Sequence, residues 1–148
     1  MSEVTKTHLH TRIQTSFEKQ GLMRLLGAEL LEVEEGRVVI GVSARPELSQ
    51  QQGFMHAGAT GAIADSAGGY AALTMFPEGA EVLSVEYKLN LLAPSAGERA
   101  EAVAKVVRAG RTLTVCTLEV YSITQKSDGE ERKLVAIGQQ TLFCVQPK

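Results

Sequence analysis

The side chains that could carry chemistry in this 148-residue chain are concentrated between Gln50 and Phe76. Ten of the fifteen residues from Gly58 to Ala72 are glycine or alanine, and the run still reads as a helix of about 18 residues. Asp65 is the one ionisable group inside that run. Because a carboxylate inside a buried helix is costly unless it is partnered or functional, Asp65 is the first candidate for a catalytic group.

His56 and Ala57 stand at the predicted start of this helix, where backbone N–H groups are free and the positive end of the helix dipole lies. Such an end can polarise a carbonyl oxygen and stabilise a developing oxyanion. Asp65 lies eight residues past Ala57, about 12 Å along the helix axis. One carbonyl carbon therefore cannot lie about 3 Å from both groups of the same chain.

A second, antiparallel copy of the helix removes this conflict, because Asp65 of one chain then faces the helix start of the other. Such an arrangement is an isologous dimer with two shared sites. The glycine and alanine surface would permit the close approach of the two helices. We therefore expect a homodimer.

Each of these residues also has a purely structural interpretation. Asp65 could be a buried acid that caps a backbone N–H, and His56 could be a hydrogen-bonding residue at the helix start. Ser84 could be a polar-face residue of a strand, and Gln50–Gln52 could be a solvated loop. Spacing alone leaves these alternatives open.

The glycines of the central helix indicate how the rest of the chain surrounds it. Each interior glycine costs about 1 kcal/mol relative to alanine in an exposed helix, so Gly61, Gly68 and Gly69 indicate burial on nearly all sides. Upstream we expect a helix over residues 11–26 with a break near Gly21, and a β-hairpin over residues 28–44. Residues 1–10 are expected to be flexible, and residues 45–55 irregular.

The chain after the central helix reads as strands joined by turns. We expect them over residues 82–92, 98–108, 111–124 and 133–145, with a charged loop at 126–131. In the first of these strands the alternation places Tyr87 and Leu89 on one face and Ser84 on the other. Residues 1–148 are thus predicted to be a single α+β domain, with a long antiparallel sheet wrapped around one helix.

Composition excludes several classes of function. The hydrophobic content is 44%, the charged content is 22% and the net charge is −2, which gives no reason to expect nucleic acid or an anionic membrane as a partner. No apolar run approaches 18 residues and the N-terminus has no hydrophobic signal core, so we expect a cytoplasmic protein. Cys116 and Cys144 lie in apolar strands and are expected to be reduced core residues.

The combined pattern resembles a known family. Gln50, then His56-Ala57-Gly58, then Asp65, followed by Gly-Tyr-Ala-Ala and VEYKLNLLAPSAGE, is similar to the PaaI-like branch of the hotdog-fold acyl-CoA thioesterases, in the 4-hydroxybenzoyl-CoA thioesterase superfamily. The similarity covers about residues 17–145. It implies the hotdog fold, hydrolysis of acyl-CoA or aryl-CoA to free acid and CoA, and no cofactor, since the CoA thioester is the substrate. It also implies a homodimer that pairs into a dimer of dimers.

The resemblance assigns roles residue by residue. It implies that Asp65 is the general base or nucleophile, that the Ala57 amide binds the thioester carbonyl and that His56 places the thioester group. Ser84 would hold the attacking water, and Gln50 occupies the family's asparagine position. Two residues depart from the family pattern: Ala57 replaces a glycine, and Gln50 is one methylene longer than asparagine, so Gln51 or Gln52 could substitute for it.

The same resemblance points to residues that contact the substrate. Gly58 accompanies Ala57 at the helix start. Arg108 and Arg111 flank a turn where they could meet CoA phosphates, although simple solvation of the turn explains them equally well. The acyl group would enter between the N-terminal and central helices, near Phe17, Leu22 and Met23, which could equally be core residues.

The chemistry is coherent without the family. A thiol leaving group has a pKa of about 8.5, so a lone carboxylate and an oxyanion donor can suffice. No serine nucleophile motif, metal-ligand spacing or phosphate-binding loop is present. The alternatives are a non-catalytic acyl-CoA sensor, which would not need Asp65, and a hotdog dehydratase, which would need a second acid.

Overall fold

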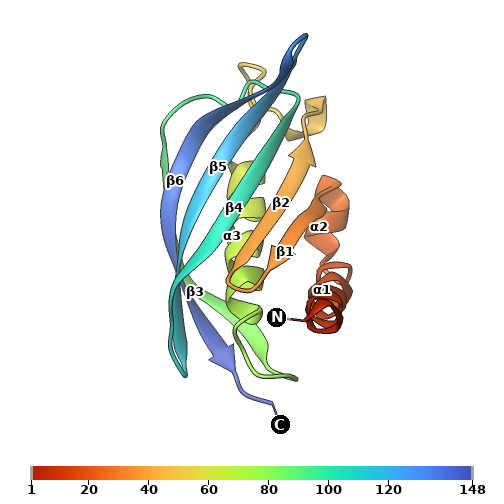
Figure 1. Cartoon of the computed structure of the whole chain (residues 1–148). Coiled ribbons are helices and arrows are strands. Elements are labelled where there is room, and N and C mark those ends of the chain that lie inside the picture. The colour runs from red at the N-terminus through yellow and green to blue at the C-terminus, as the bar shows by residue number, and fades with distance from the viewer. Residues whose placement is uncertain (1, 148) are drawn as a thin grey trace.

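A computed structural model describes residues 2–147 as one six-stranded antiparallel sheet that curls around the helix α3 (Figure 1). The strand order in the sheet is β1-β2-β4-β5-β6-β3. The helices are α1 (Glu3–Phe17), α2 (Gly21–Leu26) and α3 (Ala57–Leu73), with a 3-10 turn at Pro46–Leu48. The strands are β1 (Glu29–Glu34), β2 (Arg37–Ser43), β3 (Glu81–Leu91), β4 (Arg99–Ala109), β5 (Leu113–Lys126) and β6 (Gly129–Val145). This confirms the predicted α+β fold with a sheet wrapped around a central helix.

Small residues on both partners allow the sheet to approach α3 closely. Thirteen of the 17 residues of α3 are buried. The β4 residues that face the helix are Ala100, Ala102 and Ala104, each at most 1% exposed. Because short side chains line both surfaces, the helix backbone lies close to the sheet, which explains why its glycines are tolerated.

The N-terminal helix begins earlier than predicted. α1 starts at Glu3 rather than near residue 11, and the Ser2 hydroxyl caps it by accepting a hydrogen bond from the Thr5 amide at 3.3 Å. Its first turns are polar and exposed, so they lack the apolar spacing that marks a helix in the sequence. Arg12 ties the helix to the chain after α3 by donating to the Phe76 and Pro77 carbonyl oxygens at 3.1 and 2.9 Å.

The charged segment at residues 126–131 is mostly strand instead of the predicted loop. β5 continues to Lys126 and β6 begins at Gly129, so Ser127 and Asp128 alone connect them. The ends of this hairpin extend beyond the core, and an ion pair of 2.6 Å joins Lys126 and Glu131 there. Charged residues can occupy strand positions where neither face of the sheet is buried. The run of charges at residues 126–131 therefore did not indicate a loop.

The face assignment of Ser84 was also wrong. Ser84 pairs with Leu142 whereas Glu86 pairs with Thr141, so Val85 is an extra residue that forms a β-bulge. The bulge reverses the alternation and puts Ser84 on the same side as Tyr87 and Leu89, facing α3. Consistent with this, a Cβ atom added to Gly61 of α3 would lie 3.9 Å from both the Tyr87 hydroxyl and Leu89 Cδ1.

Both cysteines lie in the core as predicted, Cys116 fully buried and Cys144 at 2% exposure, and neither forms a disulfide. None of the helices in residues 2–147 has both the length and the hydrophobicity needed to cross a membrane.

Candidate active site

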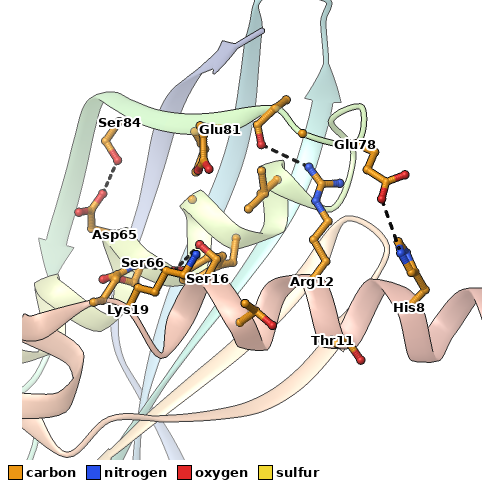
Figure 2. Close-up of a pocket in the computed structure, with 18 residues that line it drawn as sticks. His8, Thr11, Arg12, Ser16, Lys19, Asp65, Ser66, Glu78, Glu81 and Ser84 are labelled. Carbon is orange, nitrogen blue, oxygen red and sulfur yellow. Dashed lines mark hydrogen bonds and ion pairs between the residues drawn. The ribbon is translucent and has the colours of Figure 1, made fainter. Parts of the chain in front are cut away.

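The Asp65 carboxylate is half-buried on α3 and is held by two neutral donors from the sheet. The Ser84 hydroxyl donates to Asp65 Oδ1 at 2.6 Å (Figure 2), and the Gln140 side-chain amide donates to the same oxygen at 2.6 Å. The bulge in β3 aims Ser84 at this oxygen. No cation within residues 2–147 forms an ion pair with Asp65. The carboxylate is therefore oriented without being neutralised.

Gln140 of β6 is the site residue that the sequence interpretation missed. Its side-chain Nε2 also lies 3.2 Å from the Asp65 carbonyl oxygen and 3.0 Å from the Ser84 hydroxyl, so the second of its two hydrogens is shared between these acceptors, and the residue is 1% exposed. The available signal was a polar residue at an inward position of a buried strand, which usually has a specific partner.

The neighbouring glycine explains how Gln140 reaches Asp65. A Cβ atom on Gly68 would lie 1.7 Å from Gln140 Oε1, so only glycine leaves room for the amide in this position. Oε1 is buried and has no donor within the described residues. An unsatisfied buried acceptor costs about 1–3 kcal/mol. The same side-chain orientation that leaves Oε1 without a donor directs the amide nitrogen of Gln140 at Asp65.

The start of α3 presents a free backbone donor. His56 is the N-cap, and its Nδ1 accepts a hydrogen bond from the Gly58 amide at 2.7 Å, so a neutral His56 carries its proton on Nε2. The Ala57 amide has no acceptor within the part of the chain that the structure describes. His56, Ala57 and Gly58 are all exposed. This end of the helix can accept an oxyanion from outside the chain.

The glutamines before the helix form a structured turn. Gln50 Oε1 accepts from the backbone amides of Gln52 and Phe54 at 2.5 and 3.3 Å, and Gln50 Nε2 donates to Gln52 Oε1 at 3.2 Å. Gln51 is exposed. Gln50 and Gln52 line the same hollow as Ala57, which places two of the three predicted glutamines beside the helix start.

Asp65 and Ala57 open onto different hollows of the chain. Asp65 and Ser84 lie at one end of a cavity of about 780 Å³ between α1, α3 and the start of β3 (Figure 2). Ala57 lies in a separate hollow of about 390 Å³ beside the end of β3. The two groups that the sequence pairs chemically therefore do not meet within one chain.

The predicted acyl-contacting residues do not line the cavity at Asp65. Phe17 and Met23 are core residues, 7% and 1% exposed, and Leu22 is 52% exposed on α2. The Phe17 ring packs edge-on against Tyr70, with the centroids 6.0 Å apart. The cavity is lined instead by the polar face of α1, because Phe17 and Met23 point into the core that α1 and α2 cover.

The two arginines of the β4–β5 connection lie away from both hollows. Arg108 belongs to β4 and Arg111 to the turn that follows, and both side chains are exposed. Neither forms an ion pair within residues 2–147. They are available to an anionic ligand or to solvent.

The cysteine near the site is not a competing nucleophile. Cys116 is fully buried beneath α3, and its thiol lies 3.7 Å from the Gly68 carbonyl oxygen. Burial raises the pKa of the Cys116 thiol to about 12, so it carries no thiolate at neutral pH. Cys116 therefore does not compete with Asp65 as a nucleophile.

Comparisons with known proteins identify the family of the chain. The sequence profile of the thioesterase superfamily matches residues 52–128. A thioesterase family protein from Silicibacter pomeroyi has a similar structure with a TM-score of 0.87 and 40% identity, over 93% of this chain and 98% of that one. The PaaI protein of E. coli, from the phenylacetic acid degradation operon, shares the fold with a TM-score of 0.81 at 19% identity, over 97% of this chain and 98% of that one.

A curated relative adds a named activity. The 1,4-dihydroxy-2-naphthoyl-CoA hydrolase of Listeria monocytogenes is 24% identical over 106 residues, which are 72% of this chain and 86% of that protein. Together these matches support thioester hydrolysis as the general activity. The chain belongs to the thioesterase superfamily and has its PaaI-like hotdog fold.

Proposed function

We propose that this protein hydrolyses acyl-CoA thioesters to a free acid and CoA, with Asp65 as the general base or nucleophile. The observation that carries the proposal is the Asp65 carboxylate, which faces an open cavity and is oriented by the two neutral donors Ser84 and Gln140. Oδ1 receives both hydrogen bonds, so Oδ2 is the oxygen available for chemistry. Supporting this assignment, one relative is itself named as a CoA thioester hydrolase.

The reaction needs a proton acceptor and an oxyanion donor but no strong general acid. In the general-base form, a water attacks the thioester carbonyl carbon and transfers its proton to Asp65. The carbon–sulfur bond then breaks and the thiolate of CoA leaves, which is favourable because a thiol has a pKa of about 8.5. In the nucleophilic form, Asp65 attacks the carbon itself, the carbon–sulfur bond breaks as the CoA thiolate leaves, and water hydrolyses the resulting anhydride. The Ser84 hydroxyl, which donates to Asp65 Oδ1, would also contact the attacking water.

The oxyanion donor comes from a second copy of the chain in this proposal. Ala57 and Asp65 are eight residues apart, so a two-fold axis beside Gly61, their midpoint, brings Ala57 of one α3 opposite Asp65 of the other. Beside this part of the helix runs β3, an edge strand of the sheet. β3 exposes Leu83, Val85 and Leu91 by about 60% each, as expected for a surface that a partner covers.

The remaining predicted residues would complete the shared site from the Ala57 side. His56 can donate from Nε2 toward the thioester group, since its Nδ1 is engaged by Gly58. Gln50 has its Oε1 committed to the loop, so it would contribute through Nε2.

The test is a panel of acyl- and aryl-CoA substrates, with release of the free CoA thiol monitored for the wild type and for Asp65→Asn. We expect hydrolysis by the wild type and a large loss in the variant. A wild type that binds acyl-CoA but releases no thiol, or an Asp65→Asn variant that hydrolyses as well as the wild type, would favour the non-catalytic acyl-CoA sensor instead.

A further inference from the structure

The cavity beside Asp65 has a hydrogen-bonded polar wall where a pocket for an alkyl chain would be apolar. Tyr70, one residue past Gly69 on α3, is 3% exposed and its hydroxyl accepts from the Gln20 amide at 2.8 Å. The same hydroxyl lies 3.3 Å from the Ser16 hydroxyl. Gln20 Oε1 in turn accepts from the Ser66 hydroxyl at 3.1 Å. Four polar side chains from α1, the α1–α2 connection and α3 therefore form one fixed network at the cavity.

This network leaves donors free on the cavity side. Gln20 Nε2 carries two hydrogens and gives one to Tyr70. Either hydroxyl of the Ser16–Tyr70 pair can be the donor, and with Tyr70 as the donor the Ser16 proton is free for a ligand. Lys19, in the connection between α1 and α2, also lines the cavity (Figure 2), and no ion pair engages its ammonium group within residues 2–147. A ligand group that fits here needs an oxygen acceptor.

The charges around the cavity favour a neutral ligand over an anionic one. The carboxylates Asp65, Glu78 and Glu81 line it, and two of its basic side chains already have partners. Arg12 donates to backbone carbonyl oxygens, and His8 lies 3.7 Å from Glu78 at the end opposite Asp65 (Figure 2). The phosphates of CoA would meet little positive charge here, so the cavity suits the acyl side of a thioester.

We infer that this cavity is an acyl subsite for a neutral, oxygen-bearing acyl group, whose hydroxyl or oxo oxygen is bound by Ser16, Gln20 and Lys19. The inference rests on the proposed thioesterase function. The network extends from Ser66, the residue after Asp65, to Tyr70, five residues past Asp65 and about 7.5 Å along the helix axis, a length that roughly six carbon–carbon bonds span. The expected substrate therefore carries its oxygen within about six carbons of the thioester.

The test compares hexanoyl-CoA, 6-hydroxyhexanoyl-CoA and adipoyl-CoA, which differ only at the terminal carbon. We expect kcat/KM for 6-hydroxyhexanoyl-CoA to exceed that for hexanoyl-CoA by about fivefold to tenfold, the range of one added hydrogen bond. Tyr70→Phe removes the hydrogen bonds that hold Gln20 and Ser16 but keeps the ring, so in this variant the ratio should fall toward one. Tyr121→Phe is the matched control, because its hydroxyl bonds Glu119 on β5 and does not line the cavity.

Binding separates failure of the subsite from failure of the proposed function. The affinity of Asp65→Asn for the same three thioesters is measured by calorimetry, where hydrolysis does not interfere. Tighter binding of the hydroxylated thioester supports the subsite even if no thioester is hydrolysed by the wild type. Equal binding of the hydroxylated and plain thioesters, or a ratio unchanged by Tyr70→Phe, would overturn it. Preference for adipoyl-CoA over both others would overturn the assignment of a neutral ligand.

Discussion

Two carboxylates of this protein, the half-buried Asp65 and the buried Glu101, are stabilised in different ways. Glu101 of β4 is 5% exposed and is bound by two arginines, Arg99 at 2.8 Å and Arg132 at 2.5 Å. Asp65 is bound by a serine and a glutamine at equal distances of 2.6 Å and by no cation within residues 2–147.

The two arrangements suit different purposes. Burial by itself would raise the pKa of Glu101, but the hydrogen bonds from Arg132 and Arg99 outweigh it and hold that pKa below its usual value. Both Glu101 oxygens are occupied, so the group is stable and unreactive. Asp65 keeps one oxygen free at a cavity, with donors that orient it without compensating its charge. In this protein the structural acid is therefore the one that forms ion pairs, and the proposed reactive acid is the one that receives hydrogen bonds from neutral donors.

Replacement of each acid by its amide should separate the two roles most strongly. Asp65→Asn should lower kcat about 10³-fold, because it removes the proton acceptor while keeping the shape. Glu101→Gln should leave kcat nearly unchanged. Thiol-release kinetics and thermal unfolding of both variants check this prediction. Loss of activity in Glu101→Gln without loss of stability would contradict the distinction.

The second largest effect should come from the Ala57 amide, which the proposal places opposite Asp65 of another chain. Ala57→Pro removes the N–H but keeps the helix, because proline is well accepted at the first helical position. We expect kcat to fall about 10²- to 10³-fold, as for loss of one oxyanion donor. Ala57→Gly retains the N–H and should stay within a few-fold of the wild type.

Mixing the two inactive variants tests whether the site is shared. If Asp65→Asn and Ala57→Pro subunits exchange, each mixed dimer contains one site with both groups intact and one with neither. Random exchange makes about half of the dimers mixed, so activity should recover to about a quarter of the wild type. No recovery, despite exchange shown by subunits with distinguishable tags, would place both groups of one site in the same chain.

The neutral donors to Asp65 should have an intermediate effect. Gln140→Met keeps the side-chain shape and removes the donor, so kcat should fall about 10- to 100-fold, since a hydrogen bond to a charged group contributes about 1.5–3 kcal/mol. Stability should not fall, because the unpaired Oε1 of Gln140 disappears with the amide. A variant with normal kcat and a low unfolding temperature would assign Gln140 to the core instead.

Two adjacent glycines of α3 offer a matched control for this prediction. In Gly68→Ala the new Cβ would lie 1.7 Å from Gln140 Oε1, so the amide must leave Asp65 and kcat should fall as in Gln140→Met. In Gly69→Ala the nearest atoms, on Leu142 and Val82, are 3.8 and 3.9 Å away, which is ordinary contact. Gly69→Ala should keep its activity and gain up to about 1 kcal/mol of stability from helix propensity. Equal kinetics in the two variants would contradict the role of Gln140.

These residues also show what could be read from the sequence. The glycine and alanine run predicted α3 and its burial correctly, because small residues in a helix interior have few other uses. Asp65 stood out because it was the one ionisable group in that run. Gln140 did not stand out, because its role depends on a contact between residues 75 positions apart that no local pattern encodes.

The errors in the fold have a related cause. The alternation rule failed at Ser84 because one bulged residue, Val85, changes the face of all that precede it. The polar first turns of α1 carried no apolar spacing, so the helix start at Glu3 was missed. The acyl contacts assigned by resemblance to Phe17, Leu22 and Met23 stay a prediction, although none of the three lines the cavity beside Asp65.

The smallest predicted effect is the pH dependence of the stability that Glu101 contributes. Because the pKa of Glu101 is lowered in the folded state, its ion pairs stabilise the protein fully above the unfolded value of about 4.3 and are lost as the pH falls through the folded value. The arginine side chains are 35% and 43% exposed, so solvent limits the contribution to about 1–2 kcal/mol. Urea unfolding of the wild type and Glu101→Gln should therefore differ at pH 7 and converge as the pH falls below about 4. If Glu101→Gln were equally stable at pH 7, the two arginines would not stabilise this acid, and ion pairing would no longer distinguish it from Asp65.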